Sequence, residues 1–212
     1  MKVERIINSP LPSNAYVIWN ESNRQCIIID PGTPHPYKII DLCDKFNLKP
    51  EAIILTHFHF DHVWGANCLR EKYDCSIICS QRCAEKLMIP QNYFNLLYFN
   101  DESMFSIENI DVIINDNIEM DIAGIMLKFL MTPGHTDCSL CICIDNMIFT
   151  GDTIMNGYKP IIKAKHGGSK EDFSNTLKEF FMSQDLNSII YPGHDDCFVL
   201  SEVKSFYEIY IK

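Results

Sequence analysis

Thr56-His57-Phe58-His59-Phe60-Asp61-His62 places four side chains that can bind a metal ion within six residues. The apolar residues 52–55 come directly before this stretch and predict a short buried strand. Alternate residues of an extended chain face the same side, so the ligands would divide between two sides: His57, His59 and Asp61 on one, His62 on the other. The stretch could therefore supply two neighbouring metal ions.

Three later stretches repeat the order of an apolar strand, a turn with glycine or proline, and a histidine or aspartate. They are residues 125–131 followed by Thr132-Pro133-Gly134-His135-Thr136, residues 147–150 followed by Gly151-Asp152-Thr153, and residues 188–191 followed by Pro192-Gly193-His194-Asp195. Five of the seven histidines lie in the four motifs. Because the strands would deliver these side chains from the same end, we expect one metal site at the edge of a sheet scaffold.

Length and composition favour one domain over residues 1–212. A chain of 212 residues with 47% hydrophobic side chains can bury one sizeable core. The least regular segment, about residues 88–108, is expected to be an insertion that covers the substrate pocket. The simpler alternative is that its aromatic side chains only pack the insertion onto the domain; they are Tyr93, Phe94, Tyr98, Phe99 and Phe105.

Location and partners follow from charge, hydropathy and cysteine use. The first residues carry mixed charge, and no apolar run approaches the ~20 residues that span a bilayer, so we expect a cytoplasmic protein with no membrane partner. The ten cysteines are expected to be buried small apolar residues, because Cys138-Ser139-Leu140-Cys141 has no matching second pair. A net charge of −10 disfavours nucleic acid and leaves a small molecule as the partner. The oligomeric state stays open.

Hydrophobic periodicity predicts alternating strands and helices. Strands are expected at 3–7, 15–19, 26–29, 52–56 and 76–79, and helices after Pro36, at 63–73 and at 81–87. Residues 110–114 and 118–120 are expected to form a hairpin around Asn115-Asp116-Asn117. Ser169, with Asp172 three residues later, predicts the start of another helix, and a closing helix is expected to carry Val203, Phe206 and Tyr210 on one face.

Taken in order, Thr-His-X-His-X-Asp-His, Pro-Gly-His-Thr, Gly-Asp-Thr and Pro-Gly-His resemble the motifs of the metallo-β-lactamase superfamily. Within it they are most similar to glyoxalase II (hydroxyacylglutathione hydrolase) and its short relatives. The resemblance runs from about Asn14 to the end of the chain. It implies a four-layer αββα sandwich in which two mixed sheets are flanked by helices, whereas periodicity alone indicates only an α/β fold with mixed sheets.

The resemblance also implies two divalent metal ions and seven ligands. His57, His59 and His135 would hold metal 1, Asp61, His62 and His194 would hold metal 2, and Asp152 would bridge them. An anionic bridge offsets the repulsion between cations about 3.5–4 Å apart. We expect zinc, with iron or manganese as alternatives, because imidazole and carboxylate ligands do not separate these metals. Asp30 is expected beside the site without binding a metal.

The reaction expected from this site is hydrolysis of an activated carbonyl by a metal-bridging hydroxide, with Asp61 and Asp152 as the catalytic side chains. No obvious general acid remains in the motifs, and a thiolate leaves easily because a thiol has a pKa of about 8.5. A thioester is therefore placed ahead of a lactone.

True β-lactamases usually carry cysteine where Asp152 stands, which disfavours antibiotic hydrolysis. A mononuclear iron persulfide dioxygenase and a non-enzymatic redox scaffold are the competing interpretations.

Substrate contacts are expected from the loop at residues 156–168. The short relatives often carry Gly-Arg-x-(Asp/Glu) here, whereas this chain has Tyr158-Lys159-Pro160-Ile161. Tyr158, Lys159 and Lys163 are the candidate contacts, and Lys159, Lys163 or Lys165 could receive a substrate carboxylate; the alternative is a solvated loop. His166 is either an acid in the pocket or an exposed residue, and His35 is expected at the surface.

Overall fold

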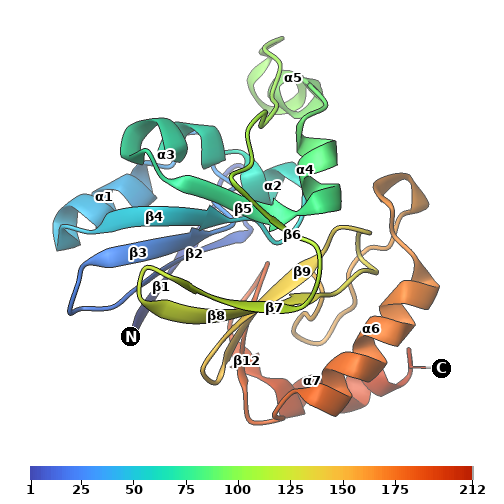
Figure 1. The fold of residues 1–212 in the computed structure, drawn as a ribbon. Helices are drawn as coiled ribbons and strands as arrows, with labels where there is room; N and C mark the ends of the chain where they lie inside the picture. The colour runs from blue at the N-terminus through green and yellow to red at the C-terminus, as the bar shows by residue number, and fades with distance from the viewer. Residues whose placement is uncertain (212) are drawn as a thin grey trace.

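A computed structural model describes residues 1–211, except for the side chains of Tyr93 and Phe94. Figure 1 shows four layers in the order helices, sheet, sheet, helices. Each sheet contains six strands and mixes parallel with antiparallel pairs. The predicted four-layer αββα sandwich is confirmed.

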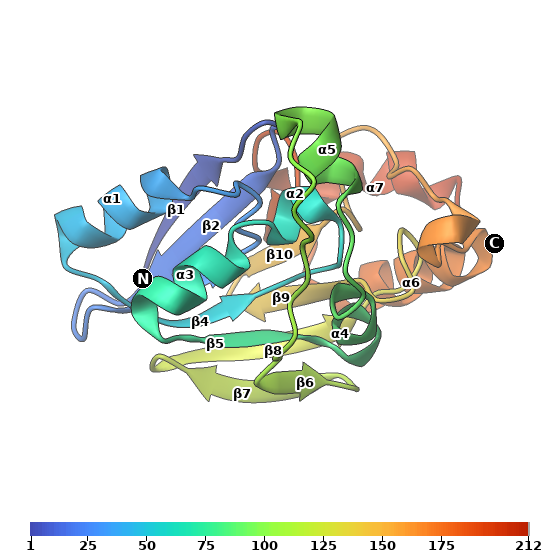
Figure 2. The same cartoon turned by 90° about the horizontal axis from the view of Figure 1, so that it is seen from above.

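The first sheet has the strand order β1-β2-β3-β4-β5-β6. Its strands are β1 (Lys2–Ile7), β2 (Asn14–Trp19), β3 (Gln25–Ile29), β4 (Lys49–Ile54), β5 (Ser76–Ser80) and β6 (Val112–Ile114). From β3 to β6 the neighbours run parallel, as crossover helices require. The helices of this half are α1 (Tyr37–Phe46), α2 (Phe60–Val63), α3 (Ala66–Tyr73), α4 (Gln81–Leu87) and α5 (Tyr93–Phe99). Seen from above, α1 and α3 lie over this sheet (Figure 2).

The second sheet has the order β12-β11-β10-β9-β8-β7. Its strands are β7 (Ile118–Ile122), β8 (Ile125–Met131), β9 (Leu140–Ile144), β10 (Met147–Gly151), β11 (Ile189–Pro192) and β12 (Phe198–Val199). The 3₁₀ turn η1 (Ala164–His166) precedes α6 (Lys170–Ser183), and α7 (Leu200–Glu208) lies near the end of the chain. Helix α6 begins as predicted, because the Ser169 hydroxyl accepts a hydrogen bond from the Asp172 N–H.

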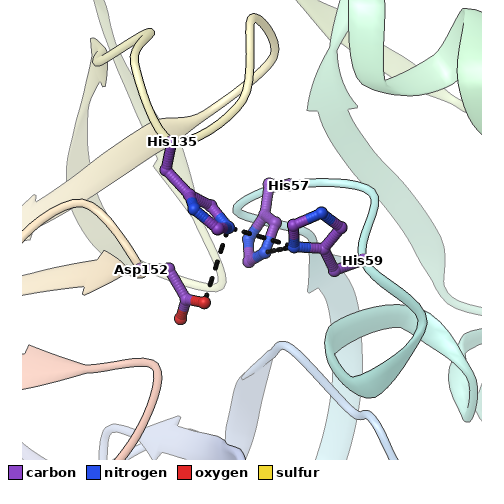
Figure 3. A group of neighbouring side chains, drawn as sticks. All are labelled: His57, His59, His135 and Asp152. Carbon is purple, nitrogen blue, oxygen red and sulfur yellow. Dashed lines mark hydrogen bonds and ion pairs between the residues drawn. The ribbon is translucent and has the colours of Figure 1, made fainter. Parts of the chain in front are cut away.

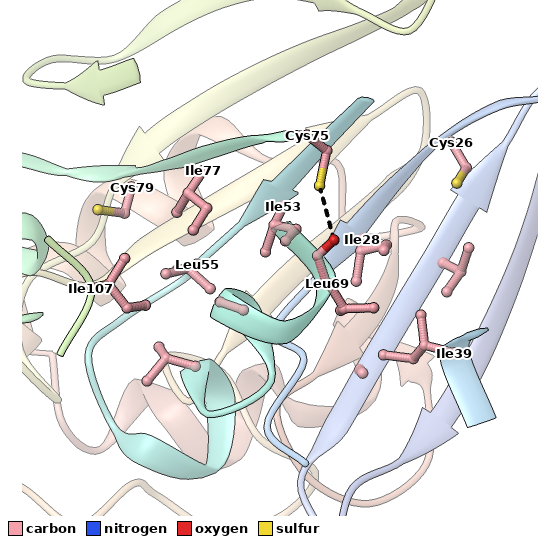
Figure 4. Close-up of a cluster of buried hydrophobic side chains, with 14 of the residues drawn as sticks. Cys26, Ile28, Ile39, Ile53, Leu55, Leu69, Cys75, Ile77, Cys79 and Ile107 are labelled. Carbon is pink, nitrogen blue, oxygen red and sulfur yellow. Dashed lines mark hydrogen bonds between the residues drawn. The ribbon is translucent and has the colours of Figure 1, made fainter. Parts of the chain in front are cut away.

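Three buried hydrophobic clusters hold the layers together. One fills the space between the first sheet and its helices and includes Ile53 and Leu69, with free cysteines such as Cys75 among its members (Figure 4). The second lies between the two sheets, and the third packs α6 and α7 on the second sheet. Cys197 is exposed and Cys68 and Cys143 are partly exposed, whereas the other cysteines are buried. Most cysteines therefore act as small apolar residues, as expected.

The predicted hairpin at residues 110–120 is wrong. Strand β6 pairs with β5 in the first sheet, while β7 pairs with β8 in the second. Residues 115–117 are therefore the link between the two sheets. Alternating hydrophobic residues indicate a strand but do not say which strand it pairs with, and a short polar link fits both arrangements.

Two predictions for residues 56–73 also need correction. Phe60 begins a helical turn, so the extended alternation predicted for residues 56–62 ends at His59. The predicted helix at 63–73 corresponds to α3, which begins only at Ala66, whereas Val63 is the last residue of α2. The closing helix is confirmed as α7: Val203 belongs to the third cluster, and Phe206 and Tyr210 pack against it. Tyr210 follows the end of α7, and the fully buried aromatic residue is Tyr207.

The segment at 88–108 packs onto the first motif through α5. The Tyr98 ring lies 6.0 Å from the Phe60 ring, and the Phe99 ring lies 5.2 Å from the Trp64 ring. Phe105 packs against the first hydrophobic cluster. These contacts attach the segment to the first motif. That it is an insertion covering the pocket stays a prediction, and the side chains of Tyr93 and Phe94 lie outside the described residues. Among residues 1–211, no helix has the length and apolar character needed to cross a membrane.

Candidate metal centre

The four sequence motifs meet at one place in the fold. His57 and His59 follow β4, and Asp61 and His62 lie in the short helix α2. The other three side chains follow strands of the second sheet: His135 comes after β8, Asp152 after β10 and His194 after β11. The centre therefore draws ligands from both sheets.

The first group of side chains is His57, His59, His135 and Asp152, which point toward one another (Figure 3). His59 Nδ1 lies 2.9 Å from His57 Nε2 and 3.0 Å from His135 Nε2. Asp152 Oδ2 lies 3.5 Å from His135 Nε2. Three ring nitrogens and one carboxylate oxygen thus converge on one point, as a tetrahedral metal site requires.

The second group is Asp61, His62 and His194, again joined by Asp152. Asp61 Oδ2 lies 3.6 Å from His62 Nε2 and 3.5 Å from His194 Nε2. Asp152 Oδ1 lies 3.5 Å from His62 Nε2 and 3.7 Å from His194 Nε2. Each oxygen of Asp152 therefore faces a different group of imidazoles.

The two groups fit divalent cations. Among the described residues, His62 Nε2 and Asp152 Oδ1 are buried side-chain atoms with no hydrogen-bond partner. Buried polar atoms are almost always paired, so two such atoms that face each other are suited to sharing a cation. Neutral imidazole nitrogens and carboxylate oxygens are ligands that zinc, iron and manganese accept.

Asp30 orients ligands of both groups through hydrogen bonds on the side away from the centre. Its carboxylate is 1% exposed and accepts hydrogen bonds from the Thr56 N–H at 2.8 Å and the Thr56 hydroxyl at 2.6 Å. Asp30 Oδ2 also lies 2.9 Å from His62 Nδ1, and Thr56 Oγ1 lies 3.0 Å from His57 Nδ1. These contacts leave the Nε2 atoms of His57 and His62 free to face the centre. Asp30 thus lies beside the site, as expected.

Gly193 allows β11 to approach the centre closely. A Cβ atom at this position would lie 2.1 Å from Asp152 Oδ1 and 2.9 Å from His62 Cε1. Any larger residue would therefore displace the carboxylate that faces both groups. The sequence shows the Pro-Gly-His turn, but only the fold shows why its middle residue is glycine.

The electrostatics of the two groups differ. Burial lowers the pKa of His57 well below its usual value and that of His59 to about 2, and neighbouring imidazoles contribute to both shifts. Burial also acts to lower the pKa of His62, but the carboxylates of Asp61, Asp152 and Asp30 outweigh it and raise this pKa to about 10. The histidines of the first group are therefore neutral at pH 7. In the second group, His62 carries a proton that a bound metal ion would have to displace.

The centre opens into a cavity of about 420 Å³. Its lining includes five of the seven ligands and the candidate substrate contacts Tyr158, Lys159 and Lys163. The structure thus brings these three residues to the same cavity, where Lys159 and Lys163 are exposed. His166 also lines the cavity, and its Nδ1 lies 2.9 Å from His59 Nε2. His35 is exposed and stacks on Tyr37, away from this cavity.

Sequence reasoning misses two side chains that touch the ligands. In the sequence Thr56 is only the start of the first motif, whereas in the structure its hydroxyl joins Asp30 to His57. The role of His166 stays undecided in the sequence because 107 residues separate it from His59. A contact of this kind has no local sequence signal; only the position of His166 in a loop after a ligand motif points to it.

Comparison with protein families matches residues 8–194 to the model described as "Metallo-beta-lactamase superfamily". The chain belongs to this superfamily. The probable metallo-hydrolase YqgX of Bacillus subtilis is 27% identical over 204 residues, which cover 92% of this chain and 90% of YqgX. The hydroxyacylglutathione hydrolase of Klebsiella pneumoniae subsp. pneumoniae is 28% identical over 153 residues, or 72% of this chain and 52% of that enzyme.

A solved structure with the superfamily fold, titled BLEG-1 B3 metallo-beta-lactamase, superposes with a TM-score of 0.86 at 20% identity. The superposition covers 96% of this chain and 97% of that chain, and it shows the shared fold. Together, the superfamily match, its metallo-hydrolase relatives and the His/Asp cluster support a metal-dependent enzyme that binds divalent metal ions.

Proposed function

We propose that this chain is a dinuclear metal-dependent hydrolase that cleaves an activated carbonyl compound, with a thioester as its substrate and a lactone as a weaker one. The arrangement of Asp152 carries the proposal. Its Oδ2 lies 3.5 Å from His135 Nε2 and its Oδ1 lies 3.5 Å from His62 Nε2, so a single carboxylate can bridge two cations. The distant resemblance to hydroxyacylglutathione hydrolase supports the thioester.

The side chains divide the chemical work. The two groups of ligands would hold cations, which would supply Lewis acidity for polarising a carbonyl and for lowering the pKa of a water molecule toward neutrality. Burial acts to raise the pKa of Asp61, but His62 and His194 lower it below its usual range, so this carboxylate stays ionised. Asp61 can therefore accept a hydrogen bond from the attacking water and orient it. Asp152 holds the two groups of ligands beside each other, because each of its oxygens faces one group.

The lining of the cavity determines which leaving groups can be protonated. The Tyr158 hydroxyl donates a hydrogen bond to Asp195 Oδ2 at 2.6 Å, and burial together with Asp195 raises its pKa above the ordinary value. Tyr158 is therefore a poor proton donor to a leaving group. A thiolate leaves without being protonated, because a thiol has a pKa of about 8.5. The engagement of the Tyr158 hydroxyl with Asp195 thus supports a thioester over an amide or an ordinary ester.

Lysines at the mouth support an anionic substrate. Lys159 and Lys163 line the cavity, and Lys159 Nζ lies 5.2 Å from the centre of the Tyr210 ring. Lys159 also borders a neighbouring cavity of about 710 Å³, which is lined by Lys170 and Tyr210 among others. We assign the acyl group to the cavity at the metal centre and a carboxylate of the substrate to these lysines.

The proposed partner is a small molecule. The net charge of −10 disfavours a nucleic-acid chain. The ten free cysteines, including the exposed Cys197, support a reducing compartment such as the cytoplasm, where thiols persist. Zinc is the metal we propose, with iron and manganese as the alternatives to be measured.

The test combines metal analysis with a substrate screen. Protein of known metal content would be assayed with thioesters, lactones and β-lactams that carry matched acyl groups. Two zinc ions per chain and thioester turnover well above the other two classes are expected. One iron per chain with oxygen uptake from a persulfide would replace the proposal with a dioxygenase, and preferred β-lactam turnover would replace it with a β-lactamase.

A further inference from the structure

Each histidine of the centre has one ring nitrogen directed at the centre and the other held by a partner. For four of the five, the partner is an oxygen atom, and the contacts are His57 Nδ1 with Thr56 Oγ1 at 3.0 Å, His62 Nδ1 with Asp30 Oδ2 at 2.9 Å, His135 Nδ1 with the Ile161 carbonyl at 2.9 Å and His194 Nδ1 with the Pro12 carbonyl at 3.2 Å. In all four, Nε2 faces the centre. Partners of this kind fix the tautomer and the ring orientation of metal ligands.

His59 is the exception in both respects. Its Nδ1 faces the centre, 2.9 Å from His57 Nε2 and 3.0 Å from His135 Nε2 (Figure 3). Its Nε2 is held 2.9 Å from the Nδ1 atom of another imidazole, His166. A ligand nitrogen must be unprotonated, so the proton of His59 sits on Nε2 and is donated outward. His166 Nδ1 must then accept it, which places the proton of His166 on its own Nε2.

We infer that His166 is a positioning residue: by accepting the Nε2–H hydrogen bond of His59, it makes Nδ1 the metal-facing atom of that ligand. The backbone around His166 suits this task. Its N–H donates to the Lys163 carbonyl at 2.9 Å, and its carbonyl accepts from Lys86 Nζ at 3.4 Å. The His166 ring also lies edge-on to the rings of His59 and Phe58, with centres 4.9 and 6.0 Å away.

The segment 161–166 therefore braces two of the three histidines of the first group. The Ile161 carbonyl holds His135, and the His166 ring holds His59. Ile161, Lys163 and His166 also line the cavity. A ligand that shifts this segment would change the metal affinity of the first group, and the metal would then change the affinity for the ligand by the same factor. Only this coupling to substrate rests on the proposed function.

The test measures metal affinity without any substrate. Apoprotein of the parent, His166→Ala and His166→Asn would compete with a chromophoric chelator for Zn²⁺. His166→Ala is expected to weaken one binding step by about 10–100-fold, the usual cost of losing an outer partner, and to leave the other unchanged. His166→Asn should recover most of the affinity, because its Oδ1 can accept the same hydrogen bond.

His35→Ala is the matched control, since His35 is exposed and stacks on Tyr37 instead of a ligand. Urea unfolding of each apoprotein shows whether a variant has lost affinity through loss of the fold. Equal affinities of the parent and His166→Ala would overturn the positioning role, as would an Asn variant as weak as the Ala variant with an intact fold. A parent that binds two Zn²⁺ but cleaves no thioester would overturn the proposed function and leave this inference standing.

Discussion

Asp152 presents its two carboxylate oxygens to two different groups of imidazoles. We expect Asp152→Ala to lose metal and activity together, because the carboxylate proposed to bridge the two cations is removed. The loss of turnover should exceed about 100-fold, the upper end of the cost of an outer partner. Metal content by elemental analysis and turnover on the same sample check this.

Asp145→Asn provides the control for that variant, because Asp145 is exposed in a turn with φ of 53°, which asparagine tolerates. Normal metal content and turnover in Asp152→Ala would refute the bridging role. A variant that cannot be purified as folded protein would be replaced by Asp152→Asn, which keeps the shape of the side chain and removes its charge.

Asp30 is the buried acceptor on which Thr56 and His62 depend. Asp30→Asn should lower the free energy of unfolding of the metal-free protein by roughly 1–3 kcal/mol, because a buried donor loses its acceptor. The metal affinity should fall about 10–100-fold, because His62 and His57 are no longer oriented. Urea unfolding in the presence of a chelator measures the first effect, and chelator competition measures the second.

The exposed Asp41 supplies the comparison for Asp30, since Asp41→Asn alters a carboxylate on the outer face of α1. An unchanged metal affinity in Asp30→Asn would show that the imidazoles are held in place without it. An equal effect of the two substitutions would point to net charge as the cause, in place of the local hydrogen bonds.

At the scale of elements, β11 must end close to β10 for the centre to form. Gly193→Ala would place a Cβ atom 2.1 Å from Asp152 Oδ1, so we expect the carboxylate to shift and at least one metal ion to be lost. Gly157→Ala is the control, because no atom lies within 4 Å of its added Cβ and its φ of +77° costs only about 1 kcal/mol. Full metal binding by Gly193→Ala would mean that β11 can move away without harm.

The strands that deliver ligands could be predicted from the sequence because each combines a local apolar run with a local turn, as in residues 147–153. The placement of β6 and β7 in different sheets could not, since that depends on partners distant in the chain. The helical turn at Phe60 also escaped prediction, because tertiary packing prevailed over the alternation of Phe58, His59 and Phe60. The contact between His59 and His166 has no local signal at all.

For the whole molecule, buried thiols make stability sensitive to alkaline pH. Burial raises the pKa of Cys141 from 9.0 to about 12, so the folded chain keeps a proton that the unfolded chain releases. The contribution of this thiol is fully present below the unfolded pKa and is lost as pH rises toward 12. At pH 10 the loss should be about 1 kcal/mol for this thiol, given the unfolded pKa of 9.0.

Urea unfolding of the metal-free protein at pH 8 and pH 10 tests this expectation. Cys141→Ala should be less stable than the parent at pH 8 but should lose less additional stability by pH 10. The same loss in both proteins would assign the alkaline sensitivity to other groups. Cys68→Ala serves as the comparison, because Cys68 lies partly exposed on α3.

The link at residues 115–117 divides the ligand set along with the sheets. The residues before it contribute His57, His59, Asp61 and His62, and those after it contribute His135, Asp152 and His194. Neither half owns a complete coordination sphere, so metal uptake reports that both halves have docked correctly. Ions that bind only the native chain also stabilise it by mass action. Metal bound at this centre would therefore also hold the two halves of the molecule together. Removing it with a chelator would lower both the stability of the fold and the activity.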